Sequence, residues 1–313
     1  MEKAVVQSAY REAVRSFEQA LSALGHLPET RDTRAQAIDL RLAQRVALRP
    51  LGDFGRVLAC LREAEAFAET LDDPCRLSQV SVFLSVHFHN MGVYDQAIVT
   101  AQRALALATA GGEVVLHALA NQYLGFAYHS QGDFRRAIDC LGQTAVSLDG
   151  AGRRERFGAV FLPAVHSRAW LAWCHAELAT FAEGKALGDE GLKIAEAVAH
   201  PASLMIASWG IGLLALRQGD LPRALPRLEQ AVAICQDADL PFYFPWMAWA
   251  LGAAYTLAER VADAVSPLTQ AMEQAAALEA GWYQVPCHLS LGACPRINVY
   301  SPVIPGQSYN LGV

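Results

Sequence analysis

The sequence has neither an excess of positive charge nor a long hydrophobic run. Its 313 residues carry 25 Lys and Arg against 31 Asp and Glu, a formal net charge of −6, so nothing in its charge favours a nucleic-acid backbone as partner. No stretch reaches the roughly 18 uninterrupted apolar residues of a membrane-spanning helix. The N-terminal segment MEKAVVQSAYREAV has charges where a signal peptide has its apolar core. We therefore expect a cytoplasmic protein that binds neither nucleic acid nor membrane.

The sequence also lacks the patterns of a disulfide framework and of common enzymes. Its seven cysteines are odd in number and scattered through apolar stretches, which indicates reduced thiols in a core. It has no G-x-x-x-x-G-K-[ST], G-x-G-x-x-G or H-E-x-x-H motif. Cys287, His288 and Cys294 give only three neighbouring ligands, whereas a structural zinc site needs four. We expect no catalytic residue, no cofactor and no bound metal, and therefore a protein that is not an enzyme.

The chain contains an internal repeat. Short turn-like segments such as Gln131-Gly132-Asp133-Phe134 recur along it, and a small or β-branched residue follows five positions after each aligned turn position. The residue numbers of the aligned positions increase in steps of 40, 40, 47, 40 and 40, by subtraction. These positions are Gly52, Gly92, Gly132, Ala179, Gly219 and Glu259, followed by Val57, Ala97, Ala137, Gly184, Ala224 and Ala264. A period of about 40 residues is typical of solenoids.

The long step contains a polar insertion. Residues 150–156, GAGRRER, form a run that we interpret as a seven-residue loop inserted into the repeat. The segment 153–156 has three arginines and one glutamate, on a chain that is otherwise acidic. The loop could meet an acidic partner or a neighbouring domain; alternatively, it is only a solvated loop.

Each unit has the apolar spacing of two helices. In the third unit, apolar residues recur at spacings of three and four on both sides of the turn at Gly132. Gly132 can adopt the left-handed backbone conformation that ends a helix, and Asp133 can cap the next helix. Each pair buries one face internally, while its other face stays apolar until the next pair covers it. The sequence therefore predicts an all-α solenoid of antiparallel helix pairs.

The units resemble tetratricopeptide repeats (TPRs), in a version longer than the usual repeat of about 34 residues. The third unit fits best, with Leu124-Gly125 and Tyr128 before its turn, and the sixth unit repeats Leu251-Gly252 and Tyr255. The resemblance implies a right-handed superhelix in which the first helix of each pair lines the concave surface. Residues on those first helices are then the candidates for binding a partner.

Several longer segments resemble one particular setting of such repeats. They are SAYREAVRSFEQALSALGHLPETR, RRERFG followed by SRAWLAWCHAEL, and LRQGDLPRALPRLEQAVAIC. These segments are similar to the C-terminal repeat region of large bacterial regulators, which carry a signal-transduction ATPase module and often a class III adenylate-guanylate cyclase domain. The similarity runs from about Ala4 to Gly292. It implies that the chain is the regulatory or sensor arm of such a signalling protein.

The repeat frame predicts a solenoid over residues 1–294, with about six full helix pairs, partial pairs at both ends and an irregular tail over 295–313. Ala13 aligns with the second helix of a pair, so Met1 would fall in the middle of a first helix. Leu291-Gly292 begin a seventh pair, which Cys294-Pro295 interrupts. We interpret the chain as a fragment, or as a reading frame disturbed near Cys294. Alternatively, the tail is a true end that folds back over the last pair.

The repeat frame also places particular side chains on the concave surface. Trp209, Trp246 and Trp249 could form an apolar platform with Arg217 as a polar anchor, a composition favoured at interfaces. Alternatively, these indoles only pack between helices. The aromatic run 242–244, in the loop before Trp246, is expected to be exposed. The candidate binding residues are Gln122, His129, His166, Glu177, Trp209, Arg217, Trp246 and Trp249, and the same frame adds Asp39, Arg49, Gln79 and His89.

Three functional hypotheses follow from the sequence. The first is a non-enzymatic scaffold for protein–protein interaction that binds a protein or peptide in its concave groove. The second is a sensor that binds a small molecule in the aromatic C-terminal half of that groove. The third is self-association through the uncapped ends of the solenoid, without a specific ligand.

Overall fold

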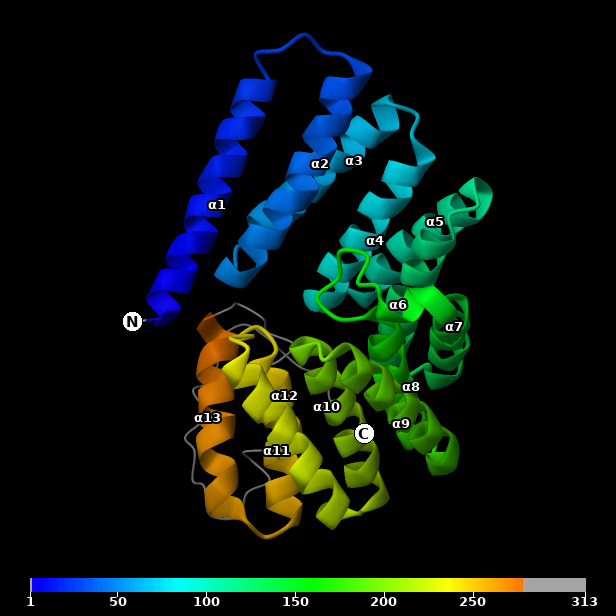
Figure 1. The fold of residues 1–313 in the computed structure, drawn as a ribbon, viewed down its shortest axis with the longest axis vertical. Coiled ribbons are helices and arrows are strands. Elements are labelled where there is room, and N and C mark those ends of the chain that lie inside the picture. The colour runs from blue at the N-terminus through cyan, green and yellow to red at the C-terminus, as the bar shows by residue number, and fades with distance from the viewer. Residues whose placement is uncertain (1, 278–313) are drawn as a thin grey trace.

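The described part of the chain is entirely helical. The computed structural model describes residues 2–277, and Met1 and residues 278–313 lie outside the described range. Thirteen α-helices and two short 3₁₀ helices follow one another, with no strand in residues 2–277 (Figure 1). They are α1 (Glu2–Leu24), α2 (Arg31–Leu48), η1 (Arg49–Leu51), α3 (Phe54–Thr70), α4 (Pro74–Asn90), α5 (Tyr94–Gly111), α6 (Val114–Ser130), α7 (Phe134–Ser147), η2 (Gly150–Arg154), α8 (Pro163–Glu177), α9 (Phe181–Val198), α10 (Pro201–Gln218), α11 (Leu221–Asp237), α12 (Phe244–Leu257) and α13 (Val261–Ala277).

The turn inside each helix pair has the same geometry in all six pairs. The aligned positions have φ angles of 74°, 74°, 81° and 81° at Gly52, Gly92, Gly132 and Gly219, and of 57° and 60° at Ala179 and Glu259. All six are therefore in the left-handed conformation that ends a helix. This confirms the turn expected at Gly132. It also shows that the repeat imposes the conformation even where the residue is not glycine, at a modest cost in backbone strain.

Aspartates that follow these turns cap the second helices. The side chain of Asp53 accepts a hydrogen bond from the backbone N–H of Arg56, and Asp133 does the same for Arg136, each at 3.2 Å. Asp220 repeats the contact with the N–H of its third successor at 3.2 Å. A carboxylate at this position satisfies one of the helix's unpaired N–H groups and interacts favourably with the helix dipole. The Gly-Asp turns thus start the second helix as the sequence predicts.

The helix pairs form an inner and an outer layer. The first helices of the pairs are α2, α4, α6, α8, α10 and α12, and they make up the inner layer. In α10, 14 of its 18 residues are buried, whereas in the outer helix α5 only four of 18 are, all of them alanines. The inner helices from α4 to α12 are therefore mostly buried, because each contacts its own partner and also the first helix of at least one adjacent pair.

The inner helices approach one another closely because small residues lie at their contacts. A Cβ atom added to Gly210 of α10 would lie 2.9 Å from the Cα of Ala169 in α8 and 3.0 Å from its carbonyl oxygen. Within pairs, Gly212 and Gly252 leave room for the leucine side chains of α11 and α13 that pack over them. Large side chains at these positions would hold the helices apart and change the curvature of the array.

The array curves so that segments near its two ends meet through side chains. The ring of Phe54, at the start of α3, lies 6.1 Å from that of Phe242 in the α11–α12 loop. The guanidinium of Arg49 lies 4.5 Å from the Phe242 ring centroid and 5.8 Å from that of Tyr243. In Figure 1, α2 and α3 lie in the upper half and α12 in the lower half, with α5 to α9 connecting them along one side. The curve therefore encloses a space between its ends.

The structure departs from the repeat frame at the N-terminus. The frame places a helix boundary before Ala13, with Met1 inside a truncated first helix. Instead, Glu2–Leu24 form one continuous helix, α1, which packs against α2. No glycine, proline, aspartate or asparagine interrupts residues 2–24, so no helix-ending residue is present. The seventh pair from Leu291-Gly292, the interruption at Cys294-Pro295 and the tail 295–313 lie outside the described residues.

The cysteines agree only in part with the expectation of core thiols. Cys60, Cys174 and Cys235 are buried, Cys140 is half-buried and Cys75 is exposed. The expectation is therefore wrong for Cys75, which lies in the first turn of α4. Cys287, His288 and Cys294, considered above as zinc ligands, lie outside the described range. Within residues 2–277, no helix has the length and apolar character needed to cross a membrane.

The close contact at Gly210 can be tested by adding one methyl group. We expect Gly210→Ala to lower the free energy of unfolding by about 1–3 kcal/mol, because the new Cβ would overlap the α8 backbone. Gly142→Ala is the matched control, since nothing lies within 4 Å of its added Cβ in α7. That change should stabilise the protein by up to about 1 kcal/mol through helix propensity. Urea denaturation of both variants measures the difference, and equal effects would contradict the close approach of α8 and α10.

Candidate functional site

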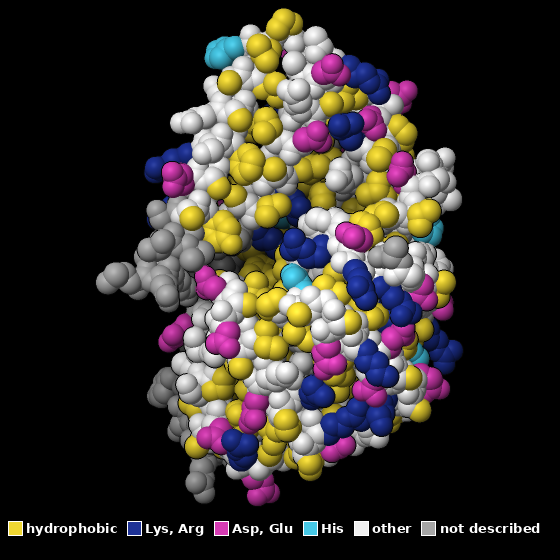
Figure 2. Space-filling view, viewed as in Figure 1, with side chains coloured by type: hydrophobic (Ala, Val, Ile, Leu, Met, Phe, Trp, Pro, Cys, Tyr) yellow, Lys and Arg dark blue, Asp and Glu magenta, His cyan; other side chains and the backbone are white. Residues whose placement is uncertain are grey.

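A cavity of about 490 Å³ lies inside the curve of the superhelix. All six inner helices contribute to its wall, which is mostly apolar. One contributor from each is Arg45 of α2, Phe83 of α4, Tyr123 of α6, His166 of α8, Ala202 of α10 and Trp246 of α12. In Figure 2 the cavity is a hollow midway along the molecule, where arginine and histidine side chains border a hydrophobic floor. Its volume falls within the roughly 300–1,000 Å³ of ligand pockets.

The aromatic wall of the cavity continues as a network through the inner helices. Phe126 of α6 stacks on Trp170 of α8, with ring centroids 4.2 Å apart and planes inclined by 29°. Trp170 lies 5.5 Å from Trp246 of α12, and Trp246 lies 4.2 Å from Trp209 of α10. Such contacts contribute stability beyond the area that they bury. The network ties four inner helices together and holds this side of the cavity in one shape.

Two loops complete the cavity. One is the segment 156–161, which begins at Arg156, the last residue of the polar insertion, and contributes Arg156 and Phe161. The other is the α11–α12 loop, which contributes Phe242 and Tyr243 and meets Phe161 through rings 4.8 Å apart. The only irregular step of the repeat therefore builds one wall of the cavity. Within the insertion, Arg153 pairs with Asp149 at 2.9 Å and Glu190 at 2.8 Å. Its charge is therefore already paired with carboxylates of the same chain.

Arg45 and Arg49 are two of the three arginines that line the cavity, and neither has a carboxylate partner in residues 2–277. Arg45 is 8% exposed, and its guanidinium lies 3.8 Å from the centroid of the Phe83 ring. Neither Arg45 nor Arg49 forms an ion pair with any carboxylate in residues 2–277, and the Nε atoms of both lack a hydrogen-bond partner there. Burial, followed by the nearby charge of Arg49, lowers the pKa of Arg45 from 12.5 to about 10. Arg45 nevertheless remains cationic at neutral pH.

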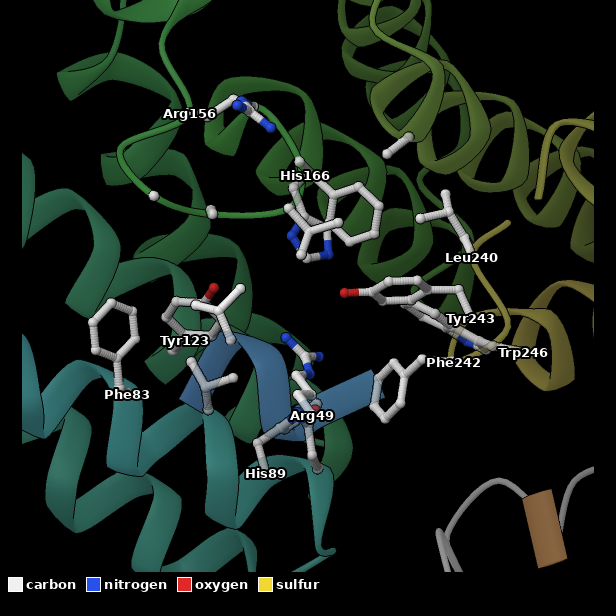
Figure 3. A pocket seen from close by; sticks show the side chains of 18 of the residues that line it. Arg49, Phe83, His89, Tyr123, Arg156, His166, Leu240, Phe242, Tyr243 and Trp246 are labelled. Atoms are coloured by element: carbon white, nitrogen blue, oxygen red, sulfur yellow. The ribbon is translucent and has the colours of Figure 1, made fainter. Parts of the chain in front are cut away.

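Figure 3 shows how the labelled polar groups face the cavity. Arg49 rises from one side beside Phe242, and the hydroxyl of Tyr243 points into the space from another side. Arg156 and His166 lie on the opposite side from Arg49. Burial raises the pKa of the Tyr243 hydroxyl, while the neighbouring Arg49 acts in the opposite direction. The one acidic residue among the described lining residues, Asp239, is exposed, so the potential inside the cavity is positive.

The histidines of the cavity are neutral. Burial lowers the pKa of His166 from 6.5 to about 3, with smaller effects from His89 and Arg49. Burial also lowers the pKa of His89 to about 4, although hydrogen bonds to Asn90 and Phe126 act in the opposite direction. The indole Nε1 of Trp170 donates a hydrogen bond of 3.1 Å to Nε2 of His166. Neutral His166 therefore carries its proton on Nδ1. The amide nitrogen Nε2 of Gln122, 3.5 Å from Nδ1, is also a donor, so these two atoms do not form a hydrogen bond with each other. A histidine that accepts a hydrogen bond in this way is held in place rather than available as a base.

The structure brings only part of the candidate set to the cavity. Of the eight residues, His166 and Trp246 line it, and so do Arg49 and His89 from the additional groove positions. Glu177 and Arg217 instead pair with each other across α8 and α10 at 2.9 Å, and the indole N–H of Trp173 donates to Glu177 at 2.7 Å. Trp249 is half-buried beside Trp173, with ring centroids 6.3 Å apart.

The expected aromatic platform with an arginine anchor is not formed. Trp209 is fully buried, because the rings of Trp170, Trp173 and Trp246 surround it between the inner helices. Gln122 and His129 are likewise buried, at 0% and 7% exposure. The aromatic run 242–244 is also buried rather than exposed as expected, since the loop folds onto the opposite end of the curve.

Sequence reasoning missed Arg45, Tyr123 and Tyr243 as cavity residues. For Arg45 a signal was available, because it precedes Arg49 by four positions and therefore lies on the same face of α2. For Tyr243 there was none, since its place depends on a loop that meets Arg49, a residue near the other end of the chain.

Known structures place this chain in a recognisable fold class. No protein-family model and no curated protein matches the sequence. The structure is similar to a Rap protein complexed with competence and sporulation factor (TM-score 0.68, 15% identity), covering 92% of this chain and 80% of that one. It is also similar to aspartyl phosphate phosphatase F from Bacillus subtilis (TM-score 0.66, 14% identity), covering 83% of this chain and 64%, less than two thirds, of that one.

A third similar structure is the Rap conjugation gene regulator of the plasmid pLS20 in complex with the Phr* peptide (TM-score 0.65, 15% identity), with 88% of this chain and 74% of that chain covered. The chain has the fold of a TPR-like helical solenoid. At these identities the similarity concerns the fold, and it agrees with the helix pairs described above.

The lowered pKa values of the buried histidines predict how the stability of the folded protein depends on pH. His166, His129 and His89 are neutral in the folded protein, with pKa values of about 3 to 4. In the unfolded chain they take up protons below about pH 6.5. Stability should therefore be fully present above pH 7 and fall as the pH drops through 6.5, by up to about 1.4 kcal/mol per pH unit for each histidine.

Thermal melts between pH 7.5 and 5 test this prediction. We expect His166→Gln to give a shallower fall of the melting temperature with decreasing pH, because one neutral buried histidine is removed. The exposed His26 provides the control, and His26→Gln should leave the slope unchanged. A slope that is the same in all three proteins would show that His166 is protonated equally in the folded and unfolded states.

Proposed function

We propose that this protein is a non-enzymatic interaction scaffold that binds a short peptide segment of a partner in its central cavity. The observation that carries the proposal is the cavity itself, to which all six inner helices contribute side chains. An occupant would contact both ends of the curve at once, through Arg49 near one end and Tyr243 near the other. Binding would therefore stabilise one curvature of the array. A change of curvature in a solenoid can in turn change the position of a domain attached to it.

The chemistry of the wall favours binding over catalysis. Among the described lining residues there is no serine, threonine, cysteine or lysine, and the single carboxylate, Asp239, is exposed. His166 is already occupied as a hydrogen-bond acceptor. A nucleophile with an adjacent base is thus not assembled by the residues that line the cavity. The peptide complexes of the similar Rap structures support a peptide as occupant.

We propose further that the scaffold serves as the regulatory or sensor arm of a larger bacterial signalling ATPase or cyclase-type regulator. The sequence resemblance that extends from about Ala4 to Gly292 supports this setting. Sequencing the genomic DNA on both sides of the reading frame tests it. An in-frame ATPase or cyclase domain supports the setting, whereas stop codons close on both sides contradict it.

A small-molecule sensor is the second candidate function. The observation that favours it is the volume of about 490 Å³ with an aromatic wall, because both are typical of pockets that bury most of a small ligand. The two functions predict different ligands. Members of a peptide library should bind to a peptide scaffold, whereas members of a library of small metabolites should bind to a small-molecule sensor. A native-state ligand of either kind raises the melting temperature by mass action.

Closing the mouth of the cavity tests the proposed function. Val46 lines the cavity and is 55% exposed, so Val46→Trp should narrow the mouth without disturbing the core. Val99 is the matched control, a 64% exposed valine on the outer helix α5. Short peptides that raise the melting temperature of the unaltered protein should lose most of that effect with Val46→Trp and keep it with Val99→Trp. An equal effect in both variants would place the binding site elsewhere.

A further inference from the structure

We infer that the cavity selects a peptide by its C-terminal carboxylate, next to an apolar last side chain. The inference rests on the proposed function and adds the chemical class of the ligand. It begins with Arg45 and Arg49, two of the three arginines of the wall, which carry positive charge without a carboxylate partner in residues 2–277. Burying a cation costs free energy that an opposite charge normally offsets.

The chain shows elsewhere how it satisfies a buried guanidinium. The side chain of Arg168 is 4% exposed and pairs with Asp149 at 3.1 Å and with Glu190 at 3.0 Å. Arg45 is almost as deeply buried, but it pairs with no carboxylate in residues 2–277, and the face of the Phe83 ring lies beside it. Arg49 adds a second cation with the rings of Phe242 and Tyr243 beside it, and its charge contributes to the lowered pKa of Arg45. The two like charges are thus close enough to disfavour each other until an anion enters.

The side chains around Arg45 and Arg49 favour a ligand that has apolar surface as well as a negative charge. Both guanidinium groups lie against aromatic rings, at 3.8 Å and 4.5 Å from the centroids of Phe83 and Phe242. An anion that reaches them is therefore in contact with an apolar wall on either side. A C-terminal residue carries its carboxylate and its side chain on the same carbon atom, so it presents charge and apolar surface together. Arginine suits a carboxylate because its planar N–H groups can bind both oxygens.

A charged aspartate or glutamate within a peptide fits this site less well. Its carboxylate would reach the arginines only if the backbone on both sides also entered the cavity, and the peptide N–H and C=O groups there would need partners. The aromatic and aliphatic side chains of the wall provide few such partners. A chain end brings fewer backbone groups into the cavity, and it needs only one opening to solvent.

Two probes with related ring systems test the charge preference directly. They are 8-anilinonaphthalene-1-sulfonate, which is anionic, and N-phenyl-1-naphthylamine, which is uncharged, and both fluoresce in apolar sites. We expect Arg45→Met and Arg49→Met each to weaken binding of the anionic probe by about tenfold or more. Binding of the uncharged probe should change less than about twofold on the same reasoning, since the apolar wall remains. Arg217→Met is the control, because Arg217 pairs with Glu177 outside the cavity.

The stability of the ligand-free protein separates a binding role from a structural role for Arg45. If Arg45 is kept for a ligand, Arg45→Met replaces an unpaired buried cation by an apolar side chain of similar length and should raise the melting temperature. A lower melting temperature with unchanged affinity for the anionic probe would assign Arg45 a structural role and overturn the inference.

Matched peptides identify the source of the anion. Pentapeptides that end in leucine or phenylalanine are compared as free acids and as C-terminal amides, with dodecanoate as a small amphipathic carboxylate. Stronger displacement of the anionic probe by the free acids supports the inference. Equal binding of acids and amides leaves the peptide scaffold in place and overturns carboxylate selection. Displacement by dodecanoate alone overturns the peptide as occupant, and no binding of any probe overturns both the inference and the proposed function.

Discussion

The turn between paired helices is the constraint on which the rest of the structure depends. At six positions the backbone is left-handed, including Ala179 and Glu259, which lack the freedom of glycine. Each such turn reverses the chain over a short segment and lays the second helix antiparallel to the first. Because the turn has the same geometry each time, the two helices are joined in a similar way in every pair. A local backbone conformation that recurs once in every helix pair therefore produces the repeating unit of the array, and the packing between the units sets its curvature.

Curvature produces a cavity because the inner helices are packed closely enough to bring the ends together. Glycine and alanine at the contact of α8 and α10 let two inner backbones approach, while tryptophans fill the concave side. The same contact between α3 and the α11–α12 loop that closes the curve also completes the wall of the cavity. Stability and function are then coupled, since a change in packing between inner helices also changes the width of the cavity.

Arg45 and Arg49, which pair with no carboxylate in residues 2–277, are a feature of the cavity that stability alone does not explain. A core selected only for stability would not hold Arg45 against a phenylalanine ring with no carboxylate partner in residues 2–277, when Arg168 in the same fold has two. Natural proteins accept such local losses where a ligand compensates for them. The neutral histidines beside these arginines keep the charge of the cavity independent of pH near neutrality, so the arginines alone define its electrostatic preference.

The sequence by itself determined the helix pairs, their turns and their two layers, because a regular repeat period and Gly-Asp signals at fixed offsets act through local backbone chemistry. It also placed Arg49, His89, His166 and Trp246 on the concave side. Only the tertiary structure decided that Trp209 is core and that Glu177 pairs with Arg217, since both depend on distances between helices. The cavity, too, is a feature that only the tertiary structure decided. Its walls join residues as distant in the sequence as Arg49 and Tyr243, and small rotations added over six pairs bring them together.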